Sequence, residues 1–241
     1  MLGIEEIKDY LQYIINVKKF SKAYVNQTYS GLKFFYETTL GRIWEMKRIP
    51  RSKKDRKLPQ VLSKDEVKRI LENTTNFKHR TILTTIYASG LRVGEVVRLK
   101  PSDIDSQCMQ IKVCMGKGKK DRFTVLSEKN LKVLRDYFKY CRPKDWLFPG
   151  ADKSKHLTER TVERVFEAAK AKAGIMKPGN VHVLRHSFAT HLLEDGTDIH
   201  YIQALLGHTS IQTTSIYLHA TTAGMKKIKS PFDMLDGDKD E

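Results

Sequence analysis

Residues 47–60 restrict the possible fold most, because they contain seven basic residues, one acidic residue and two prolines. Proline disfavours a helix and like charges repel one another, so the segment is predicted to be an extended linker. It divides the chain into residues 1–46 and residues 61–241, and each part has to bury its own apolar side chains. A linker that crosses a polyanionic backbone would explain the charge, and a solvated connector is the alternative.

The first part has the spacing of two amphipathic helices. Apolar residues recur every three or four positions over residues 4–18, which predicts one helix. Ser21 is a plausible N-cap for a second helix, which is expected to end near Gly41. One face of that second helix carries Val25, Tyr29, Leu32 and Tyr36.

The second part is predicted to be helical apart from one hairpin. Ser63 and Glu66 form a capping-box pattern that opens a helix to about Asn73. A buried helix over residues 81–88 should break at Ser89-Gly90 and resume after Arg92. Strands at 109–113 and 122–125 flank a turn of Gly116, Lys117 and Gly118. Further helices are expected over residues 127–140, 158–173, 182–193, 198–206 and 210–217. The expected fold is therefore mostly α with a small antiparallel β-sheet.

The charge of the chain points to a polyanionic partner. There are 44 Lys and Arg residues against 28 Asp and Glu residues, a formal net charge of +16. Cations that neutralise phosphates release counterions, so such an excess favours nucleic acid binding. A cationic protein that binds nothing is the alternative. No apolar run predicts a membrane span, no secretory signal is evident at the start, and the three cysteines suit reduced thiols in the cytoplasm.

Candidate reactive residues gather in short clusters. Tyr217 lies nine residues after His208, and His182-Val183-Leu184-Arg185 stands upstream. With Arg92 and Lys117 they supply one hydroxyl nucleophile and five nitrogen groups. This set suits the breaking and remaking of a DNA phosphodiester through a phosphotyrosyl bond.

Each of these residue types has a chemical role in such a transfer. Arg92 and Arg185 would bind the non-bridging phosphate oxygens, and both lie in apolar surroundings where a guanidinium needs an anion. His182 is the candidate general base for Tyr217, whose unperturbed pKa lies near 10. His208 would donate a hydrogen bond to a phosphate oxygen. Lys117 would protonate the leaving 5′ oxygen, with Lys119 as a rival and a purely DNA-gripping hairpin as the alternative.

The remaining histidines and the other chemistries fit less well. His186, His191, His200 and His219 are interpreted as structural or solvent-facing. His182 and His186 have the spacing of two zinc ligands, but the glutamate of His-Glu-x-x-His and a third ligand are missing. A transfer without metal or cofactor is therefore favoured, with cationic side chains stabilising the charge.

The clusters resemble the signature boxes of the tyrosine recombinases, with Xer-type recombinases and phage or integron integrases the most similar. The matching segments are residues 88–95, 116–118, 182–192 and 206–217. The resemblance covers roughly residues 5–235. It implies that Arg92, Lys117, His182, Arg185 and His208 surround the phosphate, with Tyr217 as the nucleophile and Glu95 supporting the first arginine.

The resemblance also implies the fold and the partners. The catalytic domain would cover residues 61–241, with a tail at 222–241, and would follow a helical SAM-like core-binding domain at 1–46. That domain looks truncated by its first one or two helices. Family membership implies a double-stranded DNA recombination site, a four-protomer synapse, a Holliday junction, and no need for ATP or metal. Apolar tail positions would dock on a neighbouring protomer or pack within the chain: Met225, Ile228, Phe232 and Leu235.

Two other functions are compatible with these clusters. A type IB topoisomerase-like enzyme would relax DNA with a similar cationic pocket and tyrosine. A catalytically idle protein would bind recombination sites and regulate them. The residues expected to contact the DNA backbone are Lys53, Lys54, Arg56, Lys119, Lys120 and Arg122.

Neutralising Lys53, Lys54 and Arg56 together should lower the salt slope of DNA binding by up to about three units, since each phosphate contact contributes nearly one unit. Affinity measured over a range of salt concentrations gives the slope. An unchanged slope would reject the DNA-crossing linker and leave the solvated connector.

Overall fold

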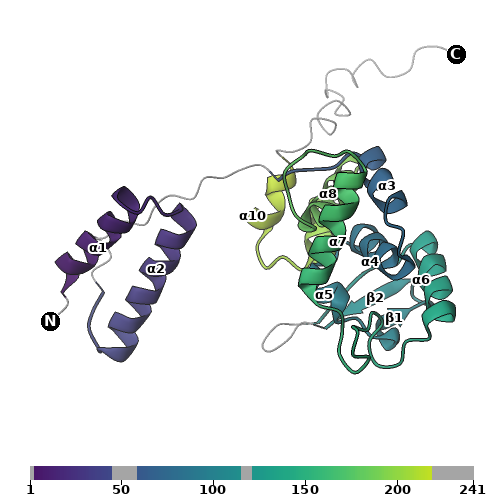
Figure 1. Ribbon diagram of the computed structural model, residues 1–241, viewed down its shortest axis with the longest axis horizontal. Coiled ribbons are helices and arrows are strands. Elements are labelled where there is room, and N and C mark those ends of the chain that lie inside the picture. The colour runs from purple at the N-terminus through teal and green to yellow at the C-terminus, as the bar shows by residue number, and fades with distance from the viewer. Residues whose placement is uncertain (1–2, 45–58, 115–120, 219–241) are drawn as a thin grey trace, which may run out of the picture. The chain divides into compact units, whose positions relative to one another are not determined.

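The computed structural model describes residues 3–44, 59–114 and 121–218 (Figure 1). The chain divides into two compact units, Met1–Lys57 and Leu58–Glu241, and this division falls inside the predicted linker. No helix within the described ranges is long and apolar enough to cross a membrane. The predictions for Lys53, Lys54, Arg56, Lys117, Lys119 and Lys120 lie outside the described residues.

Two helices make up the described part of the smaller unit, as the sequence pattern predicts. They are α1 (Ile4–Asn16) and α2 (Lys22–Phe34), and α2 continues as a π-helical turn over Phe35–Thr39. Ser21 is the N-cap of α2, and its hydroxyl accepts a hydrogen bond from the backbone N–H of Tyr24 at 3.3 Å. The predicted N-cap is thus confirmed.

The core of the smaller unit joins both helices to Trp44. The indole N–H of Trp44 donates to the hydroxyl of Tyr29 at 2.9 Å, and the indole ring packs edge-on against the rings of Tyr29 and Tyr36. The buried residues are Ile7, Leu11, Ile14, Val25, Tyr29, Tyr36 and Trp44. The apolar spacing predicted the helical members of this cluster but not Trp44.

The larger unit combines its helices with a three-stranded antiparallel sheet of order β1-β2-β3. The predicted hairpin is confirmed: β2 and β3 pair in antiparallel orientation, with Ile111 opposite Thr124. The first strand was not predicted, because two residues carry no alternation pattern. The elements are α3 (Lys64–Glu72), α4 (Phe77–Ser89), α5 (Val93–Val97), β1 (Ile104–Asp105), β2 (Gln110–Val113), β3 (Arg122–Val125), α6 (Glu128–Cys141), α7 (Glu159–Lys172), α8 (His182–Glu194), α9 (Ile199–Leu206) and α10 (Ile211–Thr214).

A capping box fixes where α3 begins. The Ser63 hydroxyl accepts from the N–H of Glu66 at 3.1 Å, and the Glu66 carboxylate accepts from the N–H of Ser63 at 2.7 Å. Two of the N–H groups that a helix start leaves unpaired are satisfied in this way. The predicted capping box is therefore confirmed.

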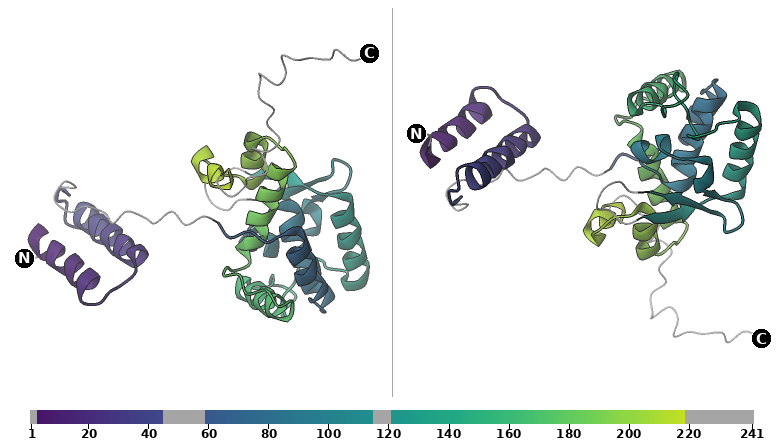
Figure 2. Two further views of the ribbon diagram at one scale, coloured as in Figure 1. Left: turned by 90° about the horizontal axis from the view of Figure 1, so that it is seen from above. Right: turned by 90° about the horizontal axis from the view of Figure 1, so that it is seen from below.

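Helix α4 occupies the middle of the larger unit, between α6 and α8 (Figure 2). Ile82, Leu83 and Ile86 are almost fully buried in the main core. The predicted buried helix is confirmed and is longer than expected, because the Asn76 side chain caps it by accepting from the N–H of His79.

Gly90 ends α4 in the left-handed conformation, with φ of 63°. A Cβ atom there would collide with the aromatic ring of Phe188 on α8. The chain can therefore turn and approach α8 closely only with glycine at this position. The predicted break at Ser89-Gly90 is confirmed, and Arg92 directly precedes α5.

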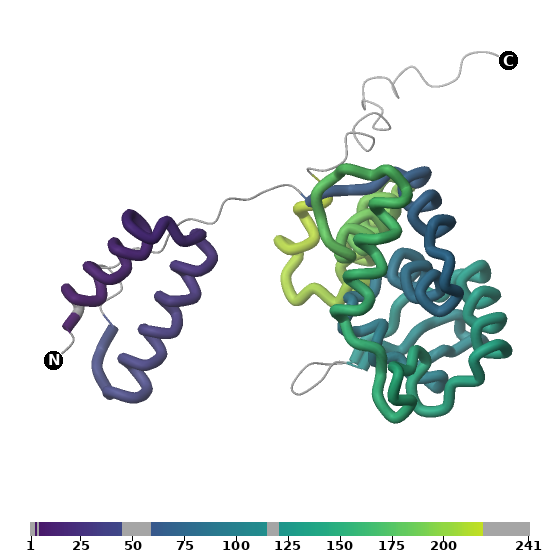
Figure 3. The backbone as a smooth tube through the Cα atoms, viewed as in Figure 1, coloured from purple at the N-terminus to yellow at the C-terminus, as the bar shows by residue number. Residues whose placement is uncertain are grey.

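The C-terminal described segment returns to α8. A 3-10 turn over Ser215–Tyr217 follows α10 at the yellow end of the described chain in Figure 3; α10 contacts α9, and the turn contacts α8. Tyr217 packs into a second small core with Phe188, Ile202 and Leu206. The helix predicted over 210–217 is thus present as two short turns. Leu62, which precedes α3 in the larger unit, is tied to α8, because its N–H donates to the Ser187 hydroxyl at 2.9 Å.

Gly90→Ala should destabilise the larger unit by several kcal/mol, since it combines an unfavourable φ with a collision in the core. Thermal or urea unfolding measures the loss. Gly174 offers a matched control, because its φ is also positive at 67° but a Cβ added there would meet no atom within 4 Å. Equal losses for the two variants would show that the contact with Phe188 contributes nothing.

Candidate active site

Arg185 lies at the centre of the site and is almost fully buried, with 4% of its surface exposed. One nitrogen, Nη1, donates to the carbonyl of Gly90 at 2.6 Å, and Nη2 donates to the carbonyl of Leu206 at 2.6 Å. These carbonyls belong to the C-terminal ends of α4 and α9, where the helix dipole favours a cation. Burial and the nearby Arg92 lower the pKa of Arg185 to about 9, so it stays charged at neutral pH.

Glu95 joins three guanidiniums in one cluster. Its Oε1 accepts from Arg92 at 2.7 Å, and both carboxylate oxygens accept from Arg122 at 2.8 Å. Nη1 of Arg185 lies 3.6 Å from Oε2 of Glu95. Burial raises the pKa of Glu95, but the hydrogen bonds and charges of Arg122 and Arg92 outweigh it and lower this pKa to about 2. The carboxylate is therefore ionised at any working pH.

The structure gives the Arg122 side chain partners within the protein, and its contact with DNA stays a prediction. Its side chain is 9% exposed and is occupied by Glu95 and by the carbonyl of Leu205, to which Nε donates at 2.9 Å. The guanidinium is thus committed to partners inside the protein. The alternation of side chains along a strand predicts this inward orientation, because Arg122 lies two residues before buried Thr124 and shares its face of β3.

His208 touches Arg185 and Thr214. Its Nε2 lies 3.2 Å from Nη2 of Arg185, and its Nδ1 lies 3.0 Å from the hydroxyl of Thr214. Since a guanidinium only donates, Nε2 is the acceptor and Nδ1 carries the proton. Burial, Arg185 and Arg92 lower the pKa of His208 to about 4, which keeps the ring neutral. The predicted phosphate donor therefore accepts a hydrogen bond in this state.

His182 begins α8 one turn before His186. Burial lowers its pKa, and Arg185 and Arg92 lower it further, so the ring is neutral at pH 7. Among the described side chains, no hydrogen bond joins the His182 ring to Tyr217. The expected contact between this candidate base and the nucleophile is not made here.

Tyr217 lies in the same subunit as the arginines and is 1% exposed. Burial raises the pKa of Tyr217, and the charges of Arg185 and Arg92 offset only part of this rise. The hydroxyl is 2.9 Å from Nδ1 of His186, and the two rings pack 5.8 Å apart. His186 is therefore half-buried and hydrogen-bonded within the protein, which agrees with its interpretation as a structural residue and not as a solvent-facing one. Its contact with Tyr217 was not predicted, although its position one helical turn after His182 puts both rings on one helix face.

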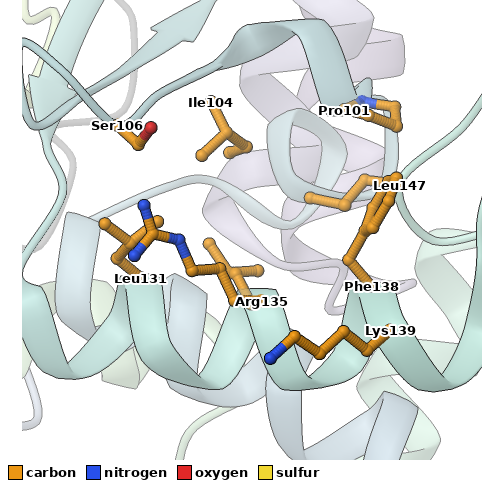
Figure 4. A pocket seen from close by; sticks show the side chains of 9 residues that line it. Pro101, Ile104, Ser106, Leu131, Arg135, Phe138, Lys139 and Leu147 are labelled. Atoms are coloured by element: carbon orange, nitrogen blue, oxygen red, sulfur yellow. The ribbon is translucent and has the colours of Figure 1, made fainter.

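A pocket of about 460 Å³ lies elsewhere on the larger unit (Figure 4). It is mostly apolar, and α6 contributes Leu131, Leu134 and Phe138 to its wall. None of the described residues predicted for the site lines it. The reactive residues instead form a largely buried cationic cluster in which Arg92 is the most exposed of the three guanidiniums, and its positive charge suits an anionic ligand better than an apolar one.

Glu95→Gln should cost roughly 3 kcal/mol of stability above pH 4.5, because the folded protein holds this carboxyl at a pKa of about 2. The lowered pKa means that this contribution is complete above pH 4.5 and disappears as the pH falls toward 2. Urea unfolding of both proteins across this range measures it. The exposed Glu167→Gln is the control and should change stability by less than about 0.5 kcal/mol. A difference between wild type and Glu95→Gln that does not shrink in acid would contradict the ion cluster.

Comparison with known proteins gives the family. The model of the phage integrase family matches residues 60–223, and that of the phage integrase N-terminal SAM-like domain matches residues 1–46. A putative integrase/recombinase of Sinorhizobium fredii is 44% identical over 98% of this chain and 94% of its own length. The tyrosine recombinase XerD of Oceanobacillus iheyensis is 40% identical over 74% of this chain and 63% of its own length.

Solved structures agree with this result. The XerA recombinase is 33% identical, with a TM-score of 0.64 over 92% of this chain and 80% of that one. The XerH site-specific recombinase in a post-cleavage complex has a TM-score of 0.75 at 22% identity, over 96% of this chain and 73% of that one, and shows the shared fold. The predicted family, mostly helical fold and recombinase activity are confirmed: the chain belongs to the phage integrase family and is a site-specific tyrosine recombinase.

Proposed function

We propose that Tyr217 is the nucleophile with which this recombinase cuts and rejoins DNA strands. Its oxygen attacks the phosphorus of the scissile phosphodiester, forms a 3′-phosphotyrosyl bond and releases the 5′ oxygen of the next nucleotide. A 5′ hydroxyl from another strand reverses the step and completes a Holliday junction. The observation that carries the proposal is the position of Tyr217 in the same small core that borders Arg185.

The charge of the cluster fits the transition state. Arg92, Arg122 and Arg185 with Glu95 carry a net charge of two positive units. A phosphodiester has one negative charge, and its five-coordinate transition state gathers about two on the non-bridging oxygens. Cations held in place before the reaction stabilise that developing charge without reorganisation. Arg92, with 36% of its side chain exposed, is the arginine that the incoming phosphate meets first.

Proton transfers complete the proposed reaction. A neutral His182 can accept a proton during attack, and Lys117 remains our proposed donor to the leaving 5′ oxygen. His208 turns toward the phosphate when the anion replaces its contact with Arg185. Glu95 supports the arginines and does not react.

The proposed partner is a double-stranded DNA recombination site. Support comes from the XerH structures bound to difH substrate and from a lambda integrase dimer bound to a core site. We propose a four-protomer synapse on such a site in the cytoplasm. Residues 1–46 and 61–241 would contact the DNA from two domains, with 47–60 crossing its backbone between them. The relatives favour neither a topoisomerase-like enzyme nor an idle regulator.

Tyr217→Phe should retain DNA binding and lose strand cleavage, because the phenyl ring fills the same space without a nucleophilic oxygen. The measurement is covalent trapping on a nicked suicide substrate, followed by denaturing gel electrophoresis. The control is Tyr140→Phe, since Tyr140 is 79% exposed on α6. A covalent adduct formed by the Tyr217→Phe protein would assign the nucleophile to another residue.

A further inference from the structure

The hydroxyl of Tyr217 is withdrawn from solvent in the described structure. The residue is 1% exposed, and its ring packs with Phe188, Ile202 and Leu206. A DNA phosphate has to reach the phenolic oxygen for an attack to occur. The described state therefore precedes the reaction, and the hydroxyl has to be released from it.

The arginines do not hold the hydroxyl in this state. Arg185 directs its nitrogens to the carbonyls of Gly90 and Leu206 and to the ring of His208. Among the described side chains, no guanidinium donates to the oxygen of Tyr217. The contact that this oxygen makes is with Nδ1 of His186, at 2.9 Å.

Burial makes that contact costly to lose. A hydroxyl enclosed by apolar side chains loses its hydrogen bonds to water and needs a replacement. His186 supplies it from α8, with a ring that is itself half-buried beside Tyr217. Without an acceptor at this position, the withdrawn state would become less favourable relative to a released one.

We propose that His186 is a positioning residue that holds the hydroxyl of Tyr217 in this withdrawn state until DNA binding releases it. The inference rests on the proposed role of Tyr217 as the nucleophile. Release breaks one hydrogen bond and exposes the phenolic oxygen to the phosphate bound by Arg92 and Arg185. The histidine regulates access of the nucleophile to the phosphate and does not touch the phosphate itself.

The charge state of His186 agrees with this role. Burial, followed by the charges of His182 and Arg185, lowers the pKa of His186 to about 4. The ring is therefore neutral at neutral pH, and in the tautomer that carries its proton on Nε2 the Nδ1 atom accepts a hydrogen bond from the hydroxyl. The hydroxyl donates, and the tyrosine stays protonated while it is held.

A second His–Tyr pair on the same helix offers a matched control. His191 on α8 lies 2.9 Å, through Nδ1, from the hydroxyl of Tyr87 on α4. Its ring also packs against the tyrosine ring, at 5.9 Å between centroids. The two pairs share helix, atoms and distance, but only one contains the proposed nucleophile.

The test measures how readily Tyr217 reacts with N-acetylimidazole in the full chain without DNA, by mass spectrometry of the peptide that contains it. His186→Phe keeps a ring but removes the acceptor, and should speed acetylation of Tyr217 about tenfold. His186→Asn restores an acceptor near the position of Nδ1 and should stay close to wild type. His191→Phe should speed acetylation of Tyr87 and leave Tyr217 unchanged.

Single-turnover cleavage of a nicked suicide substrate gives the second measurement. His186→Phe should cleave severalfold faster, because release precedes attack. Unchanged acetylation of Tyr217 would overturn the proposal, and so would a hundredfold loss of cleavage, which would make His186 part of the chemistry. Cleavage by Tyr217→Phe would instead reject the nucleophile. Thermal unfolding checks that each variant folds, and His186→Ala replaces His186→Phe if the latter does not.

Discussion

The Glu95 carboxylate is the interaction on which the rest of the site depends. Three guanidiniums would repel one another in a half-buried space, and one ionised carboxylate between them makes their arrangement stable. It reaches Arg92 within its own turn, Arg122 on the sheet and Arg185 on α8. The carboxylate thus joins elements that are far apart in sequence and leaves a residual positive charge for the ligand.

Backbone carbonyls, together with the Glu95 carboxylate, fix the position of the Arg185 guanidinium. The ends of α4 and α9 both adopt the left-handed conformation, at Gly90 and Gly207, and both present a carbonyl to Arg185. The guanidinium is therefore fixed in two directions before any phosphate arrives. A donor held in this way costs little further entropy when the charge develops.

The sequence predicted the helices, the hairpin and the family because local patterns carry that information. Capping serines, apolar spacing and the glycine break are properties of neighbouring residues, and Ser63 and Gly90 confirmed them. Long-range pairing is different. Arg122 pairs with a carboxylate 27 positions away, and His186 faces a tyrosine 31 positions away. Which of several histidines meets Tyr217 depends on how α8 packs against the last turn, and no short motif specifies it.

The hydrogen bond between Leu62 and Ser187 limits how this protein can be shortened. Leu62 is buried, and its backbone N–H is bound to the residue that follows His186 on α8. A fragment that began beyond this leucine would strip an apolar side chain and a backbone donor from the helix that bears Arg185. Anyone isolating the larger unit has to keep the few residues that lead into α3, although they belong to no helix or strand.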